Sequence, residues 1–219
     1  MSLSKVRIAL LACLLTLAAP AAHAGAQIYE PLSASVRAAL YKAISDQAVP
    51  YLAFQTEAEA RSWLTVMSSR LAKRMPDQVA REEFLVTVHY EAKRAGLDPQ
   101  LVLGLIQVES AFRKYAVSTA SARGYMQVMP FWVKLIGGAE TDHNLFHLRT
   151  NLRYGCTILR HYLDIENGDL FRALGRYNGS LGRAPYPNSV LQAWTAYWSY
   201  AARAADVAQQ APKPAAAAM

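Results

Sequence analysis

The apolar residues of this chain recur at helical spacing over most of its length, and no convincing run alternates between apolar and polar residues as a strand would. This pattern predicts an all-α, mainly helical fold. We expect helices over residues 35–46, 56–74, 77–94, 98–109, 151–166, 170–177 and 188–208. The turn-rich stretch over residues 178–187 is expected to be a loop.

Cap residues support several of these helix ends. Thr56 and Glu59 have the spacing of a capping box, and Gly96 closes the third helix. Asp98 followed by Pro99 is the combination expected at an N-cap and at the first position of a helix. The fourth helix is therefore expected to begin at residue 98.

The N-terminus has the layout of a secretory signal peptide. Lys5 and Arg7 precede an apolar run over residues 8–19, and a small-residue exit follows at residues 22–24. The run is too short for a membrane span, which needs about 20 apolar residues. We therefore expect export, cleavage before Gly25 and a periplasmic protein without a membrane span.

The two cysteines bear on anchoring and on disulfides. The residues ending at Cys13 resemble a lipoprotein processing site, which would leave a lipid-anchored protein. We favour cleavage because the apolar run continues past Cys13 through Leu17, whereas a lipoprotein site normally closes that run. Cys156 is then the only cysteine of the exported chain, so its core must hold the fold without an internal disulfide. Helical spacing predicts that Cys156 is a small buried residue.

The formal net charge of +7 falls to +5 without the two cations of the leader. A basic surface suits an anionic partner, although ordinary solubility explains the charge equally well. Nucleic acid fits an exported protein poorly, whereas peptidoglycan with its acidic peptides fits well. The sequence contains no phosphate-cradling glycine loop, and its histidines share no metal-ligand spacing, so we expect no cofactor and no metal.

Glu109 is the most informative residue of the sequence. It ends a strongly apolar helix, and residues 110–139 contain no Asp or Glu. A carboxyl group in apolar surroundings favours its protonated form, which a general acid needs near neutral pH. A helix-terminal glutamate taken alone is usually solvated or salt-bridged, so the hypothesis depends on this neighbourhood.

Four blocks of sequence follow one another in a consistent order around Glu109. They are residues 98–102 leading into 109–112, then residues 116–118, 124–130 and 176–178. Together these blocks resemble the soluble lytic transglycosylase (SLT) family, although any one of them would be a weak signal. The resemblance covers roughly residues 85–195 and implies a lysozyme-like fold.

The resemblance also implies a reaction. The family cleaves the β-1,4 bond between N-acetylmuramic acid and N-acetylglucosamine without water and leaves a 1,6-anhydromuramyl end, with Glu109 as the sole acid and base. Ordinary glycosidases use two carboxylates, and the acid-free stretch after Glu109 agrees with one. Four more distant acids could still approach in the fold: Asp142, Asp164, Glu166 and Asp169. The alternatives are a goose-type lysozyme, which delivers water, and a non-catalytic peptidoglycan-binding or assembly protein.

By the same resemblance, five further residues belong to the substrate site. Ser118 and Gln127 would contact sugar groups, Met129 would pack against the substrate, and Tyr177 would form a hydrogen bond near Glu109 or the cleavage site. Asn178 is expected to fix the turn and the tyrosine rather than to touch sugar. Ser118 as a turn cap and Met129 as a core residue are the alternatives.

Two positions depart from the family pattern. Tyr125 stands where leucine is usual, and its ring would add a stacking surface for sugar or narrow a subsite. Ser121 stands where glycine is usual, and a different loop conformation is expected because serine does not reach positive φ freely.

These observations divide the chain into four parts. They are a signal peptide over residues 1–24, an N-terminal helical region over 25–84, a lysozyme-like SLT catalytic domain over 85–208 and a disordered Pro/Ala-rich tail over 209–219. The N-terminal helices lie outside the resemblance. Partners from the envelope machinery would bind there.

Overall fold

The computed structural model describes residues 27–137 and 141–201, so the predicted signal peptide and the predicted tail lie outside the described residues. The helices are α1 (Ala34–Ile44), α2 (Glu57–Leu71), α3 (Gln78–Arg94), α4 (Pro99–Ser110), α5 (Pro130–Ile136), the 3-10 helix η1 (Asp142–Phe146), α6 (Leu148–Ile165), α7 (Leu170–Asn178), α8 (Pro185–Gln192) and the π-helix η2 (Ala193–Trp198). Only isolated β-bridges join extended segments within the described ranges. The predicted all-α class is confirmed.

The predicted caps of α2 and α4 are confirmed. Thr56 and Glu59 form a reciprocal capping box at the start of α2. The Asp98 side chain accepts a hydrogen bond from the Gln100 amide at 2.7 Å, and Pro99 occupies the first turn of α4. Each pair satisfies amides that a helix start would otherwise leave without an intrahelical partner.

Other predicted boundaries were wrong. The predicted loop over residues 178–187 ends early, because α8 begins at Pro185. Proline is suited to the first turn of a helix, where its missing N–H would have no intrahelical partner in any case. The helix then widens into η2 from Ala193 instead of continuing regularly. The two short helices α5 and η1 were not predicted, because seven and five residues are too few to give a clear period.

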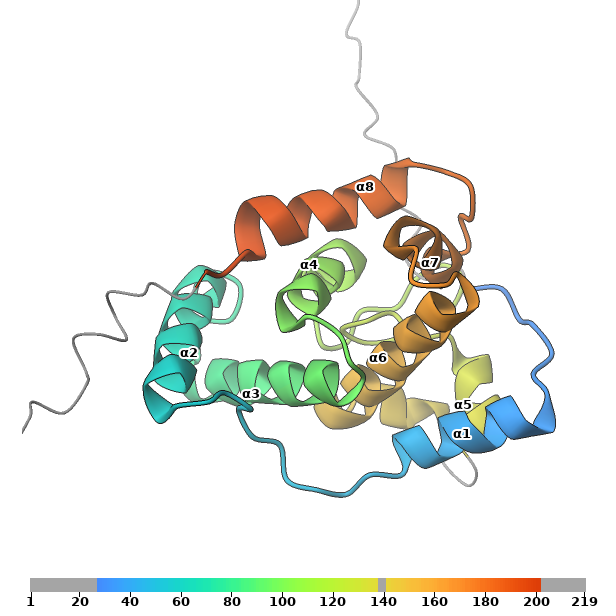
Figure 1. Cartoon of the computed structure of the whole chain (residues 1–219), viewed down its shortest axis with the longest axis horizontal. Helices are drawn as coiled ribbons and strands as arrows, with labels where there is room; N and C mark the ends of the chain where they lie inside the picture. Colours follow the sequence, from blue (N-terminus) through green and yellow to red (C-terminus); the bar gives the residue numbers. More distant parts are fainter. Residues whose placement is uncertain (1–26, 138–140, 202–219) are drawn as a thin grey trace, which may run out of the picture.

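The helix α4 lies at the centre of the fold, with α3 on one side and α8 and η2 on the other (Figure 1). Gly104 permits this approach, because a Cβ at that position would lie 2.9 Å from the Trp194 amide nitrogen. Trp198 is buried, and its indole donates a hydrogen bond to the Gln107 side chain at 2.9 Å. This C-terminal tryptophan therefore contributes to packing, and it fixes α4 from the side opposite α3.

The N-terminal helices share this core. The helix α2 packs on α3, α1 packs on α5 and α6, and one cluster of buried apolar side chains runs from Leu40 to Trp198. The predicted boundary after residue 84 lies inside α3, and the division into domains stays a prediction. Within the described part of the chain, no helix has the length and apolar character that crossing a bilayer requires.

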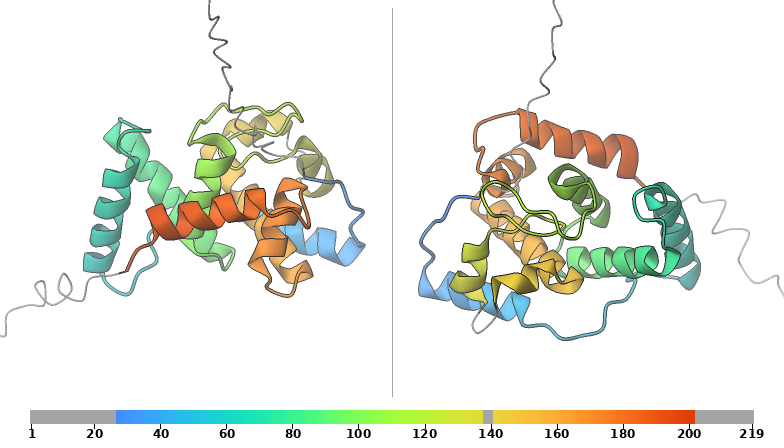
Figure 2. Two further views of the ribbon diagram at one scale, coloured as in Figure 1. Left: turned by 90° about the horizontal axis from the view of Figure 1, so that it is seen from above. Right: turned by 180° about the vertical axis from the view of Figure 1, so that it is seen from behind.

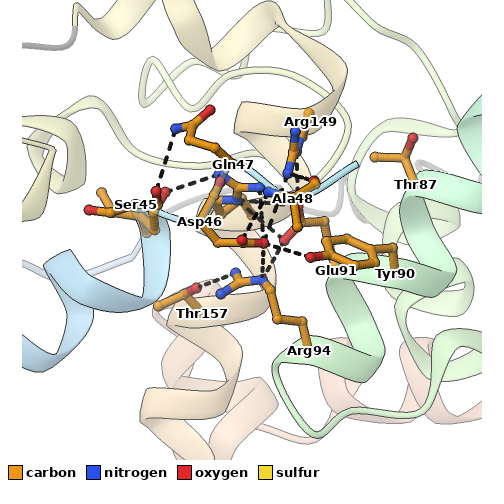
Figure 3. A network of polar contacts seen from close by, with 12 residues as sticks. Ser45, Asp46, Gln47, Ala48, Thr87, Tyr90, Glu91, Arg94, Arg149 and Thr157 are labelled. Carbon is orange, nitrogen blue, oxygen red and sulfur yellow. Dashed lines mark hydrogen bonds and ion pairs between the residues drawn. The ribbon is translucent and has the colours of Figure 1, made fainter. Parts of the chain in front are cut away.

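A partly buried group of charges ties α1 to α3 and α6 (Figure 3). We call it the arginine cluster; it consists of Asp46, Glu91, Arg94, Arg149 and Arg153. The Glu91 carboxylate is fully buried and accepts hydrogen bonds from Arg153 Nη2 and from Arg94 Nε, each at 2.9 Å. Because both oxygens are bonded, the charge of this carboxylate is balanced inside the protein.

The arginines of the cluster also hold the end of α1. Arg94 donates to the carbonyl of Ala43, Arg153 donates to the carbonyls of Ile44 and Asp46, and Arg149 donates to that of Ala48. The last carbonyls of a helix lack intrahelical partners, and Arg94 and Arg153 satisfy those of Ala43 and Ile44. The bonds to Asp46 and Ala48 fix the segment that follows α1. The cluster therefore joins the N-terminal region to the helices that carry the rest of the fold.

Candidate active site

Glu109 lies in the last turn of α4 and is 4% exposed. The helix ends directly after it, because Ala111 and Phe112 both adopt left-handed backbone conformations, with φ of 50° and 65°. Such conformations are uncommon for residues with a side chain and require support from their surroundings. The expectation of a buried acid at the end of an apolar helix is confirmed.

Tyr186, from the first turn of α8, donates a hydrogen bond from its hydroxyl to Glu109 Oε1 at 2.5 Å. Burial raises the pKa of Tyr186, and the nearby charge of Glu109 raises it further. The phenol therefore remains protonated and acts as a donor. The sequence analysis missed this residue because it assigned position 186 to a loop, and a single tyrosine there carries no motif.

Tyr177 is fully buried near the end of α7, and its hydroxyl donates to the Met126 carbonyl oxygen at 2.8 Å. Burial raises the pKa of Tyr177, and the charge of Glu109 raises it further. The hydrogen bond to residue 126 joins α7 to the loop over residues 111–129, which we call the active-site loop. Asn178, at the end of α7, is also buried, and Gly179 follows it with φ of 74°.

Gln127 stabilises the active-site loop from within. Its side chain is 2% exposed and donates hydrogen bonds to the carbonyl oxygens of Ala116 at 3.1 Å and Gly124 at 2.8 Å. Its own backbone lies at φ of 48°, in the left-handed region. In this arrangement the amide donors serve the loop, and the predicted contact between Gln127 and sugar stays a prediction.

Ser118 caps a turn of the same loop. Its Oγ accepts hydrogen bonds from the amides of Ala120 at 3.2 Å and Ala122 at 3.1 Å, which leaves its hydroxyl hydrogen as a possible donor to a ligand. Ser121 lies at φ of 70°, so this serine takes the left-handed conformation that glycine favours. The turn accommodates serine at a cost of about 1–2 kcal/mol.

Tyr125 and Met129 differ in how far they are exposed. Tyr125 is 7% exposed, and its ring packs against Phe84 of α3 with centroids 4.9 Å apart. Its ring thus contributes to the core in this structure, and its predicted role beside a sugar remains untested. Met129 is half-buried at the start of α5, where its backbone amide bonds to the Gln27 side chain at 3.1 Å.

Asn151 of α6 is a further residue that the sequence analysis missed. Its Oδ1 accepts from the Met126 amide, and its Nδ2 donates to the carbonyls of Arg123 and Leu145, all at 2.8 Å. Gly124 makes room for this contact, since a Cβ there would lie 2.4 Å from Asn151 Nδ2. The fully buried side-chain amide of Asn151 therefore fixes the active-site loop on α6.

We expect Asn151→Leu to lower the free energy of unfolding by roughly 2–3 kcal/mol, because the buried Met126 amide and Leu145 carbonyl lose their side-chain partner. Urea denaturation followed by circular dichroism measures the effect. Asn188→Leu is the matched control, because Asn188 is exposed on α8. Equal stability losses in the two variants would contradict the assigned role of Asn151.

The four distant acids named above have other partners. Asp142 pairs with Arg123 at 3.0 Å, and Asp164 pairs with Arg160 at 2.6 Å. Glu166 binds both Arg172 and Arg176, and Asp169 caps the first turn of α7. Each of these carboxylates thus has an ionic or capping partner of its own.

Comparison with known proteins shows a family match and several similar lytic transglycosylases. The sequence profile of the family described as "Transglycosylase SLT domain" matches residues 87–213, which is more than half of the chain. "Membrane-bound lytic murein transglycosylase C" of Haemophilus influenzae strain PittEE is 34% identical over 119 residues, covering 48% of this chain and 33% of the relative. The protein of the same name from Histophilus somni is 36% identical over 118 residues, covering 48% of this chain and 32% of the relative.

This chain therefore spans about a third of the length of these curated relatives. Among solved structures, an inactive mutant of the lytic transglycosylase Slt from Pseudomonas aeruginosa aligns with a TM-score of 0.46 and 18% identity, covering 77% of this chain and 44% of that chain.

Proposed function

This chain belongs to the transglycosylase SLT family, and from that premise we propose that it is a lytic transglycosylase acting on peptidoglycan glycan strands. The bond cleaved is the β-1,4 bond between N-acetylmuramic acid and N-acetylglucosamine. The observation that carries the proposal is a buried Glu109 at the end of α4, held by the Tyr186 hydroxyl. We place the reaction in the periplasm, where the predicted signal peptide would direct the chain.

In the proposed mechanism Glu109 acts twice. Its protonated carboxyl group first donates a proton to the glycosidic oxygen, so that the bond to the muramic acid C1 breaks. The resulting carboxylate then takes the proton of the muramic acid 6-hydroxyl, whose oxygen forms the new bond to C1. Glu109 ends protonated, the product carries a 1,6-anhydro ring, and no water is consumed.

Tyr186 supports both states of Glu109. A hydrogen bond to a carboxylate is stronger than one to a neutral group, so the phenol stabilises Glu109 after the first proton transfer. It also fixes the orientation of the carboxyl group toward the bond that breaks. The engagement of Asp142, Asp164 and Glu166 with arginines supports a mechanism with one carboxylate.

Product chemistry tests this function. Purified peptidoglycan incubated with the protein should release muropeptides that carry 1,6-anhydro ends, as identified by mass spectrometry. Reducing ends would instead indicate a goose-type lysozyme activity. Release of neither product by folded protein would favour a binding or assembly role.

Envelope protein partners at the N-terminal helices are a separate prediction. Because α1 and α2 pack into the common core, deleting them would disturb the fold. Substitutions on their exposed faces are the appropriate test, with binding to the candidate partner as the measurement.

A further inference from the structure

The residues before α1 contact the active-site loop although they lie outside the part of the chain that the family profile matches. Gln27 is 4% exposed. Its side-chain oxygen accepts from the Met129 amide at 3.1 Å, and its side-chain nitrogen donates to the Gln127 carbonyl at 3.3 Å. A single amide thus pairs with the backbone on both sides of Val128, much as a neighbouring strand would.

Two other residues of this segment contact α5 and α7. The ring of Tyr29 meets Phe131 of α5 edge-on, with centroids 5.6 Å apart. Glu30 pairs with Arg176 of α7 at 2.9 Å, directly before Tyr177 in the chain. We call residues 27–32 the N-terminal strap; they run along the edge of the molecule from the active-site loop toward α1 (Figure 2).

The backbone that Gln27 holds is one of the strained parts of the active-site loop. Gln127 has a left-handed φ of 48° without being glycine, and its side chain is already used to bind the loop internally. Such a conformation persists only where the surrounding structure determines it. Gln27 bonds to the carbonyl of Gln127 itself and to the amide of Met129, which is half-buried two residues further along the loop.

We propose that the N-terminal strap completes the active site, with Gln27 as a positioning residue that fixes residues 127–129 for binding the glycan strand. This inference rests on the proposed function. The Gln27 side chain bonds to the loop backbone, whereas the Tyr186 side chain bonds to the acid. Loss of Gln27 should therefore weaken substrate binding while proton transfer by Glu109 continues.

The test uses the full chain and soluble glycan strands of defined length. Gln27→Leu removes both hydrogen bonds at similar volume and is expected to raise KM about tenfold while kcat stays within about twofold. Gln27→Asn keeps the amide but is one methylene shorter, and it serves if the leucine variant does not fold. Gln47→Leu is the matched control, because Gln47 is exposed and its side chain bonds to the carbonyl of Ser45, two residues away.

The outcomes separate the strap from the proposed function. A raised KM with kcat retained, seen for Gln27 but not for Gln47, supports the inference. Unchanged KM and kcat in an active Gln27 variant would overturn it, as would a fall in kcat together with Tm at constant KM, which marks a purely structural role. Failure of the wild-type protein to cleave any strand would count against the proposed function itself.

Discussion

Glu109→Gln is expected to lower the rate of glycan cleavage by about 10²- to 10⁴-fold, the range that one general acid and base contributes. Glutamine has nearly the same shape, and its amide oxygen can still accept the hydrogen bond from Tyr186. It cannot transfer a proton, so both chemical steps are lost while the fold is kept. The measurement is the initial rate of soluble product release, with thermal unfolding as the check on structure.

Companion variants make this prediction specific to one carboxylate. Asp142→Asn and Asp164→Asn remove acids that pair with arginines, and we expect both to keep activity within a few-fold of the wild type. Tyr186→Phe removes the hydrogen bond to Glu109 and should lower kcat by roughly tenfold or more. Near-normal cleavage by Glu109→Gln, or complete loss in Asp142→Asn, would contradict the assignment.

Glu91→Gln is expected to destabilise the protein by about 3–5 kcal/mol, because it leaves buried guanidinium charges without their carboxylate. In a chain of this size that corresponds to a fall in Tm of roughly 10 °C. The loss has consequences beyond α3, since the same arginines hold the carbonyls at the end of α1. Denaturant titration and thermal unfolding measure the two quantities.

The control for this substitution lies on the same helix. Glu83 is exposed on α3, so Glu83→Gln should change stability by no more than about 0.5 kcal/mol. Equal effects of the two substitutions would show that the arginine cluster does not stabilise the fold. At temperatures well below Tm, Glu91→Gln should still cleave glycan strands, because the cluster's contacts run to α1, α3 and α6.

Features with local causes could be predicted from the sequence. The start of α4 follows from Asp98 and Pro99, which act on the first turn of the same helix. The burial of Glu109 follows from the apolar residues before it on that helix. Cys156 is buried as its spacing indicated, and burial raises the pKa of its thiol.

Features that depend on distant contacts could not be predicted. Tyr186 meets Glu109 across 77 positions, and Gln27 meets Gln127 across 100, so no local pattern relates either pair. Asn151 has an ordinary position within α6, and only the folded chain brings its amide under residue 126. The packing of the Tyr125 ring against Phe84 could not be predicted either, because α3 supplies an aromatic partner that the loop sequence does not reveal.

The most direct test of the central claim is cleavage of purified peptidoglycan in water enriched with heavy oxygen, followed by mass spectrometry of the released ends. Attack of the 6-hydroxyl oxygen on C1, with Glu109 taking its proton, predicts unlabelled 1,6-anhydro ends from the wild type and at least about 10²-fold slower formation of such ends by Glu109→Gln. Reducing ends that carry the heavy oxygen would show that water attacks C1, and would contradict the account.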